Sequence, residues 1–287
     1  MRYAGLPTER VRRGFPPLES GAGAVRALAR SAARAAMSVG RAAAAVNRGA
    51  ELLAAALRSG RRIVFFGAGS SGRLAVMEAA ELWPTFRVKA AAAIAGGARA
   101  VLRSVEGAED DAGAGRKAAA RLGPGDVAVG ATASGVTRWV EGALREARRR
   151  GAGTILVTCH PRPPIRADVV VSLQTGAEPL AGSTRMNAGT ATKVALNTMT
   201  TTAMAKIGKT WRNRMVDVLA TNRKLRDRAA RLVADLGGST HPRARALLRQ
   251  GGSVKAAIVM ARLGCGSAEA RTRLAAARGA LAPILGR

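Results

Sequence analysis

The chain has 287 residues, 48% of them hydrophobic, and carries a formal net charge of +29 at pH 7. This length and apolar content predict a folded globular protein with one large domain and smaller parts, and they exclude a disordered chain. The positive charge suggests nucleic acid as a partner, but the basic residues are spread over nearly every segment. Only three Trp, one Tyr and four Phe could stack on bases. We therefore expect incidental rather than specific nucleic-acid binding.

The first 58 residues are expected to form an N-terminal arm and two helices. Residues 1–20 contain three prolines and no periodicity, which favours an irregular arm. Alanine-rich residues 24–37 and 41–57 predict helices that are broken around Gly40. A DNA-reading helix-turn-helix needs a better-formed core than these segments offer, so we interpret them as lead-in helices.

Residues 59–212 alternate short β-rich runs with helical ones, which predicts an α/β fold with a parallel sheet and helices on both faces. The five expected strands are residues 63–66, 88–94, 127–131, 154–158 and 169–173. The expected helices are residues 73–82, 113–122, 138–150 and 185–206. If the strand order is 2-1-3-4-5, the loops after strands one and three share one ligand crevice.

The turn after the first strand reads Gly67-Ala68-Gly69-Ser70-Ser71-Gly72 and opens a helix. Glycines allow a sharp turn and close backbone approach, and a helix N-terminus presents free N–H groups to an anion. The spacing matches a dinucleotide fingerprint, but the next strand lacks the acidic residue that binds the ribose. Ser70 and Ser71 favour a phosphate monoester. A loop that only turns the chain is the alternative.

Glu81 interrupts the apolar stripe that Leu74 and Met77 begin on the first helix of the sheet domain. Burying an ionised carboxylate is costly unless it is paired or protonated. The pattern therefore indicates a carboxylate in a cleft. An ion pair with one of the many arginines is an equal alternative.

Two further hydroxyl-rich loops precede helices. The loop after the third strand carries Ser134, Gly135 and Thr137, at the position that the strand order would bring beside the first loop. The other loop carries Ser183 and Thr184, before the helix expected at 185–206. Either of these two residues could equally serve as a helix N-cap without any ligand.

Residues 213–287 predict a small helical domain. Helical segments at 222–236, 241–250, 253–263 and 267–285 are separated by glycines. Val254, Ile258, Val259 and Leu263 are expected to form a core of their own, and no catalytic cluster is visible there.

No apolar run in the sequence approaches the length of a membrane span, and the N-terminal residues lack the apolar centre of a signal peptide. We therefore expect a cytoplasmic location and no membrane partner. Cys159 and Cys265 lie far apart without a nearby set of histidines, so neither a disulfide framework nor a metal site is expected.

Six strings, in chain order, resemble those of the N-acetylmuramic acid 6-phosphate etherases, a family of sugar isomerase domain proteins. They lie at residues 67–86, 94–111, 126–144, 176–201, 213–225 and 254–264 and cover most of residues 60–265. The most unusual strings are VEGAED at 105–110, GSTR with AGT at 182–190, and MVDV with ATN at 215–222.

The resemblance implies cleavage of the lactyl ether of N-acetylmuramic acid 6-phosphate, giving N-acetylglucosamine 6-phosphate and D-lactate, by a homodimer without metal or organic cofactor. The chemistry is elimination across C2 and C3 of the ring-opened sugar, followed by addition of water. One carboxylate removes the C2 proton, and another protonates the departing lactate oxygen and then activates water. The resemblance gives the acid role to Glu81 and the second role to Glu109. Spacing alone does not separate Glu109 from Glu106, Asp110 and Asp111.

The residues expected to bind the phosphorylated amino sugar come from the three hydroxyl-rich loops. They are Gly69, Ser70, Ser71, Ser134, Gly135, Thr137, Ser183 and Thr184.

Four positions depart from the usual family pattern. Trp83 stands where the family usually has Pro, and Asn187 stands where it has Lys. Val136 replaces an Arg, while Arg138 is gained two positions further on. These changes bear on substrate preference and turnover.

Two other functions share this domain family. One is a noncatalytic phosphosugar-binding regulator similar to the glucokinase regulatory protein, which is longer and has two such domains. The other is an aldose–ketose isomerase, which gives no reason for the VEGAED string. Cleavage of N-acetylmuramic acid 6-phosphate would distinguish the etherase from these two hypotheses.

Overall fold

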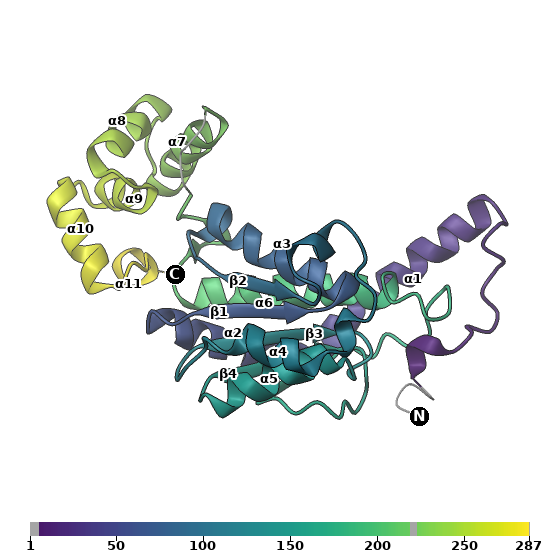
Figure 1. The fold of residues 1–287 in the computed structure, drawn as a ribbon. Helices are drawn as coiled ribbons and strands as arrows, with labels where there is room; N and C mark the ends of the chain where they lie inside the picture. Colours follow the sequence, from purple (N-terminus) through teal and green to yellow (C-terminus); the bar gives the residue numbers. More distant parts are fainter. Residues whose placement is uncertain (1–5, 219–222, 287) are drawn as a thin grey trace. The chain divides into compact units, whose positions relative to one another are not determined.

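The computed structural model describes residues 6–218 and 223–286 (Figure 1). The chain forms two compact units. Residues 1–80 and 89–202 make up the sheet unit, and residues 81–88 and 203–287 make up the C-terminal unit. The division into three domains at residues 58 and 212 stays a prediction.

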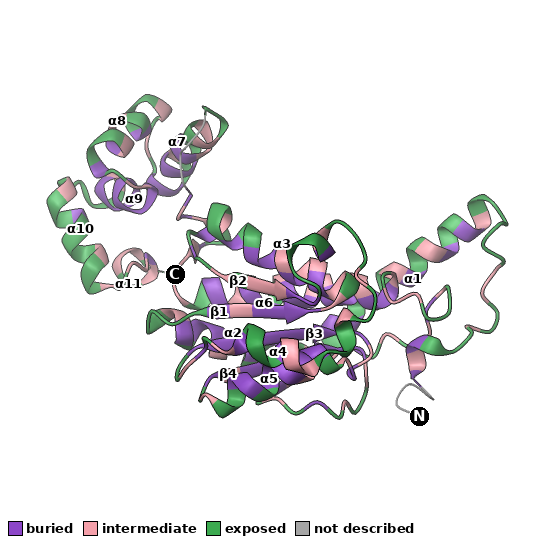
Figure 2. Ribbon diagram, viewed as in Figure 1, coloured by how far each residue is buried: buried purple, intermediate pink, exposed green. Residues whose placement is uncertain are grey.

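The sheet unit contains a five-stranded parallel sheet in the order β2-β1-β3-β4-β5, which confirms the predicted fold class and strand order. The strands are β1 Ile63–Gly67, β2 Ala91–Ile94, β3 Val127–Thr132, β4 Gly153–Thr158 and β5 Val169–Ser172. All six residues of the central strand β3 are buried, as the purple ribbon in Figure 2 shows. Strand β2 starts three residues later than predicted, because Val88 bonds back to Leu82 and not to the sheet.

Helices cover both faces of the sheet. The helices up to Lys206 are α1 Ala22–Arg41, α2 Ala43–Arg58, α3 Gly69–Phe86, α4 Ala112–Ala119, α5 Arg138–Arg149 and α6 Asn187–Lys206, with short 3-10 helices η1 Pro7–Glu9, η2 Ala98–Val101 and η3 Ala108–Asp110. A Cβ added at Gly49 of α2 would lie 3.6 Å from Cδ1 of Ile155, an ordinary contact, whereas α5 shares a buried cluster with Leu156. Successive strand residues face opposite sides, so α2 and α5 lie on opposite faces of the sheet.

Helices α4 and α5 pack with almost no side chain between them at two points. A Cβ added at Gly115 would lie 2.0 Å from the carbonyl oxygen of Trp139, and one at Gly142 would lie 2.2 Å from that of Ala112. Trp139 is 3% exposed and its ring centroid lies 6.1 Å from that of Phe66 on β1. These two glycines therefore fix the α4–α5 pair and the η3 segment that leads into it.

Helix α3 is longer than the 73–82 predicted. It begins at Gly69, so part of the glycine-rich turn is already its first turn, and it ends at Phe86. Pro84 lies in its last turn, where the missing N–H removes only one bond of the helix.

The C-terminal unit contains a small hairpin and five helices within its described residues. They are β6 Thr210–Trp211, β7 Arg214–Met215, α7 Arg223–Gly237, α8 His241–Gly251, α9 Val254–Leu263, α10 Ser267–Ala276 and α11 Ala282–Leu285. Residues 219–222 of the 213–225 string, including the predicted helix start Asn222, lie outside the described residues. The hairpin was not predicted, because its two turn residues, Arg212 and Asn213, adopt positive φ without any glycine.

The C-terminal unit has its own hydrophobic core, as predicted. Val254, Ile258 and Val259 are buried in it, but Leu263 is 42% exposed, so its predicted core position is wrong. The single helix predicted at 267–285 is also wrong. The chain breaks after α10, where Arg278 and Gly279 have φ of 51° and 76°.

Among the described residues, no helix is long and apolar enough to cross a membrane.

The α4–α5 contact yields a stability prediction. Gly142→Ala should lower the free energy of unfolding by about 1–3 kcal/mol, because the new methyl group meets a backbone carbonyl that has no rotamer to change. Gly40→Ala in α1 is the matched control: nothing lies within 4 Å of its added Cβ, so it should stabilise by up to about 1 kcal/mol. Urea denaturation followed by circular dichroism measures both, and equal midpoints for the two variants would contradict the packing account.

Candidate active site

The three glycines of the turn between β1 and α3 each meet a different steric demand. Gly69 has φ of 52°, which favours glycine. A Cβ on Gly67 would lie 2.7 Å from the Cα of Gly72, and one on Gly72 would lie 2.5 Å from Cγ1 of Ile94 on β2. The end of β1 therefore contacts the first turn of α3 through bare backbone.

Ser70 and Ser71 lie in that first turn of α3. Both side chains are half-buried, and neither hydroxyl has a hydrogen-bond partner among residues 6–218 and 223–286. Because the helix begins here, its first N–H groups lie beside the two hydroxyls. The arrangement suits an anion with several oxygens.

The loop between β3 and α5 is held in shape by its own hydroxyls. The Oγ1 atoms of Thr132 and Thr137 lie 2.8 Å apart, and the N–H of Val136 donates to Ser134 Oγ at 3.3 Å. Thr137 is the N-cap residue of α5 but makes no side-chain bond to that helix. Gly135 has φ of 71°, and a Cβ there would lie 2.8 Å from His160 Cβ. The start of α5 is therefore left without a side-chain cap.

The β1–α3 and β3–α5 loops leave neighbouring strands at the same edge of the sheet. Gly67, the last residue of β1, is paired in register with Ala131 near the end of β3. Ser70 and Ser71 therefore belong to one loop, and Ser134 and Thr137 to the next loop along this edge, as the strand order predicted.

The third loop does not cap its helix in the predicted way. Helix α6 begins at Asn187, two residues later than predicted, and the fully buried carboxylate of Glu178 accepts the N–H groups of Asn187 at 2.8 Å and Ala188 at 2.9 Å. N-capping by Ser183 or Thr184 is therefore wrong as an interpretation of this loop. Both residues are half-buried, and their turn is attached to η1 through the N–H of Gly182, which donates to the carbonyl of Thr8.

Two buried glutamates were missed by sequence reasoning. Burial raises the pKa of Glu178, although the two N–H donors and the charge of Arg12 act in the opposite direction. Glu78 on α3 is 3% exposed, and its Oε1 accepts the Thr200 hydroxyl at 2.6 Å while Oε2 accepts the side-chain amide of Asn197. The spacing of Ala75, Ala79 and Leu82 could have shown that Glu78 lies on the buried face.

Glu81 itself does not lie on the buried face, so that prediction is wrong. The buried face of α3 carries Ala75, Ala79 and Leu82, whereas Leu74 and Met77 are half-buried and Glu81 is exposed. The carboxylate that interrupts the buried face is Glu78. Glu81 is thus an exposed carboxylate in the last turns of α3.

The acidic residues between η2 and α4 have different partners. Asp111 caps α4 by accepting the N–H of Ala114 at 2.9 Å, and the Ser104 hydroxyl donates to Glu106. Glu109 lies exposed on η3. Its pKa is raised above the ordinary 4.5, first by partial loss of hydration and then by the negative charges of Asp110 and Glu106.

The four departures from the family pattern lie in different surroundings. Val136 is buried, so it belongs to the interior of its loop, and Arg138 is exposed at the start of α5. Trp83 is 44% exposed, two residues after Glu81. Asn187 is 3% exposed and its side-chain amide bonds to Ser31 on α1 at 3.0 Å.

Curated relatives decide the family. An N-acetylmuramic acid 6-phosphate etherase of Deinococcus radiodurans is 48% identical over 238 residues, which span 80% of this chain and 78% of that protein. An N-acetylmuramic acid 6-phosphate etherase of Salmonella typhimurium is 48% identical over 240 residues, 81% of each chain. The chain belongs to the N-acetylmuramic acid 6-phosphate etherase family.

Two broader comparisons agree with the fold of this etherase-family chain. Residues 45–148 match the family model of the glucokinase regulatory protein N-terminal SIS domain. The structure of a phosphoheptose isomerase from Francisella tularensis is similar with a TM-score of 0.50 and 18% identity, over 63% of this chain and 96% of that chain. At that identity the second likeness shows the fold alone.

The etherase-family chain places no set of three or more His, Cys, Asp or Glu side chains together, within the described ranges 6–218 and 223–286, in a way that could hold a metal ion.

The raised pKa of Glu109 can be measured directly. We expect the Glu109 carboxyl, followed by ¹³C NMR and assigned by its loss in Glu109→Gln, to titrate above 4.5. Asp110→Asn removes a neighbouring negative charge and should lower that pKa. Asp111→Ser is the control, because serine keeps a cap for α4 and Asp111 is not among the causes of the shift. A larger effect of Asp111→Ser than of Asp110→Asn would contradict this assignment.

Proposed function

We propose that this chain cleaves the D-lactyl ether of N-acetylmuramic acid 6-phosphate, giving N-acetylglucosamine 6-phosphate and D-lactate. The observation that carries the proposal is 48% identity to etherases over about four-fifths of the chain. Glu81 and Glu109, the two carboxylates that the chemistry needs, are both present within the matching strings.

Glu109 is the proposed base. In the ring-opened sugar the C1 aldehyde acidifies the proton on C2, so a carboxylate can remove it. A raised pKa makes Glu109 a stronger proton acceptor than an ordinary glutamate, provided that it remains ionised at the working pH. Its exposure leaves it accessible to a sugar.

Glu81 is the proposed acid. It would protonate the lactate oxygen as the bond from C3 breaks, and the carboxylate that results would then activate water for addition at C3. Glu78, one turn earlier, is tied to α6 by Asn197 and Thr200, so it is unsuited to this exchange of protons and instead holds α3 in place. Elimination and hydration together change no oxidation state overall, so the scheme needs no oxidant or reductant.

The phosphate is proposed to bind at the edge of the sheet where the two hydroxyl-rich loops leave β1 and β3. Ser70, Ser71, Ser134 and Thr137 would contact it, together with N–H groups at the starts of α3 and α5. Gly69 and Gly135 shape these loops through their positive φ. Ser183 and Thr184 are proposed to contact the same substrate.

We also propose that the enzyme is a cytoplasmic homodimer. Helix α1 exposes Val25 by 66% and Met37 by 70%, whereas the apolar residues of α6 are mostly buried. The dimer contact is therefore assigned to the lead-in helices.

Lactate release tests the function. Purified protein given N-acetylmuramic acid 6-phosphate, with no metal or nicotinamide added, should release D-lactate. Glu81→Gln and Glu109→Gln should each slow release by roughly 10²–10⁴-fold, the contribution of a positioned acid or base. Glu106→Gln, which changes a carboxylate that accepts a hydrogen bond from Ser104, is the matched control and should slow lactate release far less.

A wild-type protein that binds the phosphosugar but releases no lactate would contradict the etherase and favour a noncatalytic regulator. The match of residues 45–148 to the glucokinase regulatory protein domain makes that the competing candidate.

The phosphate site has its own test. Thr137→Val should weaken binding of N-acetylglucosamine 6-phosphate by about 10–100-fold, since a hydrogen bond to a charged group is worth about 1.5–3 kcal/mol. Thr137→Ser keeps the hydroxyl and should bind nearly as wild type. Calorimetry measures both, and equal losses in the two variants would place the phosphate elsewhere.

The dimer is tested by light scattering at high salt, where the mutual repulsion of highly charged copies is screened. We expect a dimer mass for wild type and a shift toward monomer for Val25→Asp with Met37→Asp. A wild-type monomer at micromolar concentration would contradict the proposal.

A further inference from the structure

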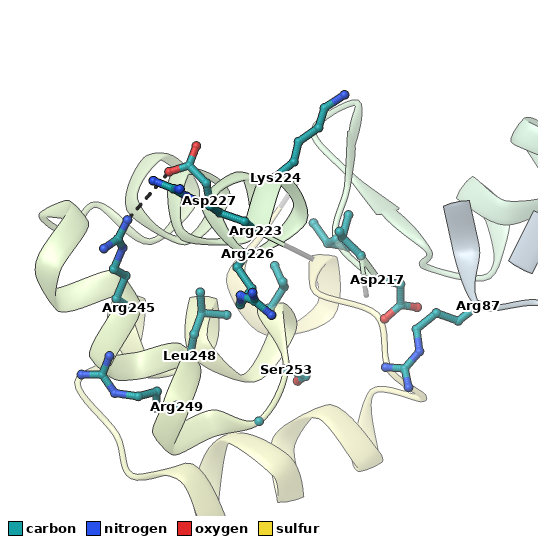
Figure 3. A pocket seen from close by; sticks show the side chains of 14 residues that line it. Arg87, Asp217, Arg223, Lys224, Arg226, Asp227, Arg245, Leu248, Arg249 and Ser253 are labelled. Carbon is teal, nitrogen blue, oxygen red and sulfur yellow. Dashed lines mark ion pairs between the residues drawn. The ribbon is translucent and has the colours of Figure 1, made fainter. Parts of the chain in front are cut away.

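The C-terminal unit contains a large cavity lined with basic side chains, and none of the lining residues is proposed above to act on the substrate (Figure 3). Its volume is about 1190 Å³. The basic residues come from three places: the segment after α3, the start of α7 and one face of α8. They are Arg87, Arg223, Lys224, Arg226, Arg245 and Arg249.

The two acidic residues of the cavity wall are already shared among other cations. The Oδ2 atom of Asp217 lies 2.8 Å from the Nζ atom of Lys209 and 3.0 Å from the Nζ atom of Lys255. Asp227 is 3.0 Å from Arg231 and 4.0 Å from Arg245, the pair that Figure 3 marks with a dashed line. These ion pairs of the two carboxylates therefore do not include Arg87, Arg223, Lys224 or Arg249.

Four of the wall cations lack a carboxylate partner. Within residues 6–218 and 223–286, no carboxylate forms an ion pair with Arg87, Arg223, Lys224 or Arg249. The side chains of the last three are exposed on α7 and α8 and can move toward a ligand. Such a group of like charges around one hollow favours a ligand with several negative charges.

Nearby positive charges also affect the pKa of a buried lysine, Lys255. Burial lowers the pKa of Lys255 below 10.5, and the positive charges of Lys209 and Arg87 lower it further, against the effect of Asp217. Of these two cations Arg87 lines the cavity, so an anion bound there would offset its charge.

The remaining wall is apolar. Val216, Val218, Leu248 and Val254 line the cavity together with the turn between α8 and α9. A volume of about 1190 Å³ is above the usual range of small-molecule sites, roughly 300–1,000 Å³, and far exceeds that of a lone phosphate. Among the described residues no aromatic side chain lines it, which is unlike the stacking surface of a single-stranded nucleic-acid site.

We propose that this cavity binds an organic polyphosphate, a small metabolite with two or more linked phosphate groups, with the phosphates on the basic residues of α7 and α8 and the organic part against the valines and Leu248. The proposal does not depend on the etherase activity.

Calorimetry on the full-length protein, at about physiological salt to suppress nonspecific attraction, tests the site. Magnesium-free ATP should bind at least tenfold more tightly than AMP, which has the same organic part and one phosphate. Arg223→Gln with Lys224→Gln should weaken ATP binding by at least tenfold, about 1.4 kcal/mol. The matched control is Arg243→Gln with Arg271→Gln, which removes the same charge from exposed positions of the same unit outside the cavity wall.

Three results would overturn the proposal. They are absence of ATP binding to wild type, equal affinity for ATP and AMP, and equal weakening by the cavity pair and the control pair. Circular dichroism of both pairs verifies that they are folded, since all four side chains are exposed and none belongs to the core of the unit.

Discussion

The candidate site depends on the parallel pairing of β1 with β3 and on the bare backbone contact at the end of β1. Pairing of Gly67 with Ala131 brings two loops to one edge of the sheet. Close backbone packing of Gly67 against Gly72 then holds the first turn of α3 next to the strand. Because this contact leaves no room for a methyl group, the N–H groups of the helix start are held at the strand edge, where an anion can reach them.

The carboxylates of the sheet unit and of helix α3 have two different roles. Glu78 and Glu178 are buried and fully engaged, one joining α3 to α6 and the other capping α6. Breaking such buried hydrogen bonds is unfavourable in free energy, so Glu78 and Glu178 stabilise the fold. Glu81 and Glu109 are exposed, which leaves them able to exchange protons with a substrate and with water. Exposure therefore distinguishes the two proposed catalytic acids from the two structural ones.

Much of the fold followed from local patterns, because strand order and helix alternation depend on hydrophobic runs and glycine turns. The site was harder to predict. The Leu74–Met77–Glu81 stripe was given the wrong face, since α3 starts four residues earlier and buries its alanines and Glu78 instead. Capping of α6 by Glu178 depends on a loop conformation that no periodicity encodes. The capping of α4 by Asp111 was likewise not predicted, because spacing alone does not show which acidic residue of this segment bonds to the helix.

The proposed elimination and hydration break the ether on the sugar side. Reaction of N-acetylmuramic acid 6-phosphate in water enriched in ¹⁸O, followed by mass spectrometry of both products, tests this bond cleavage. We expect the heavy oxygen on C3 of N-acetylglucosamine 6-phosphate and unlabelled D-lactate. Heavy oxygen in the hydroxyl of the lactate would show cleavage on the lactyl side and would contradict it.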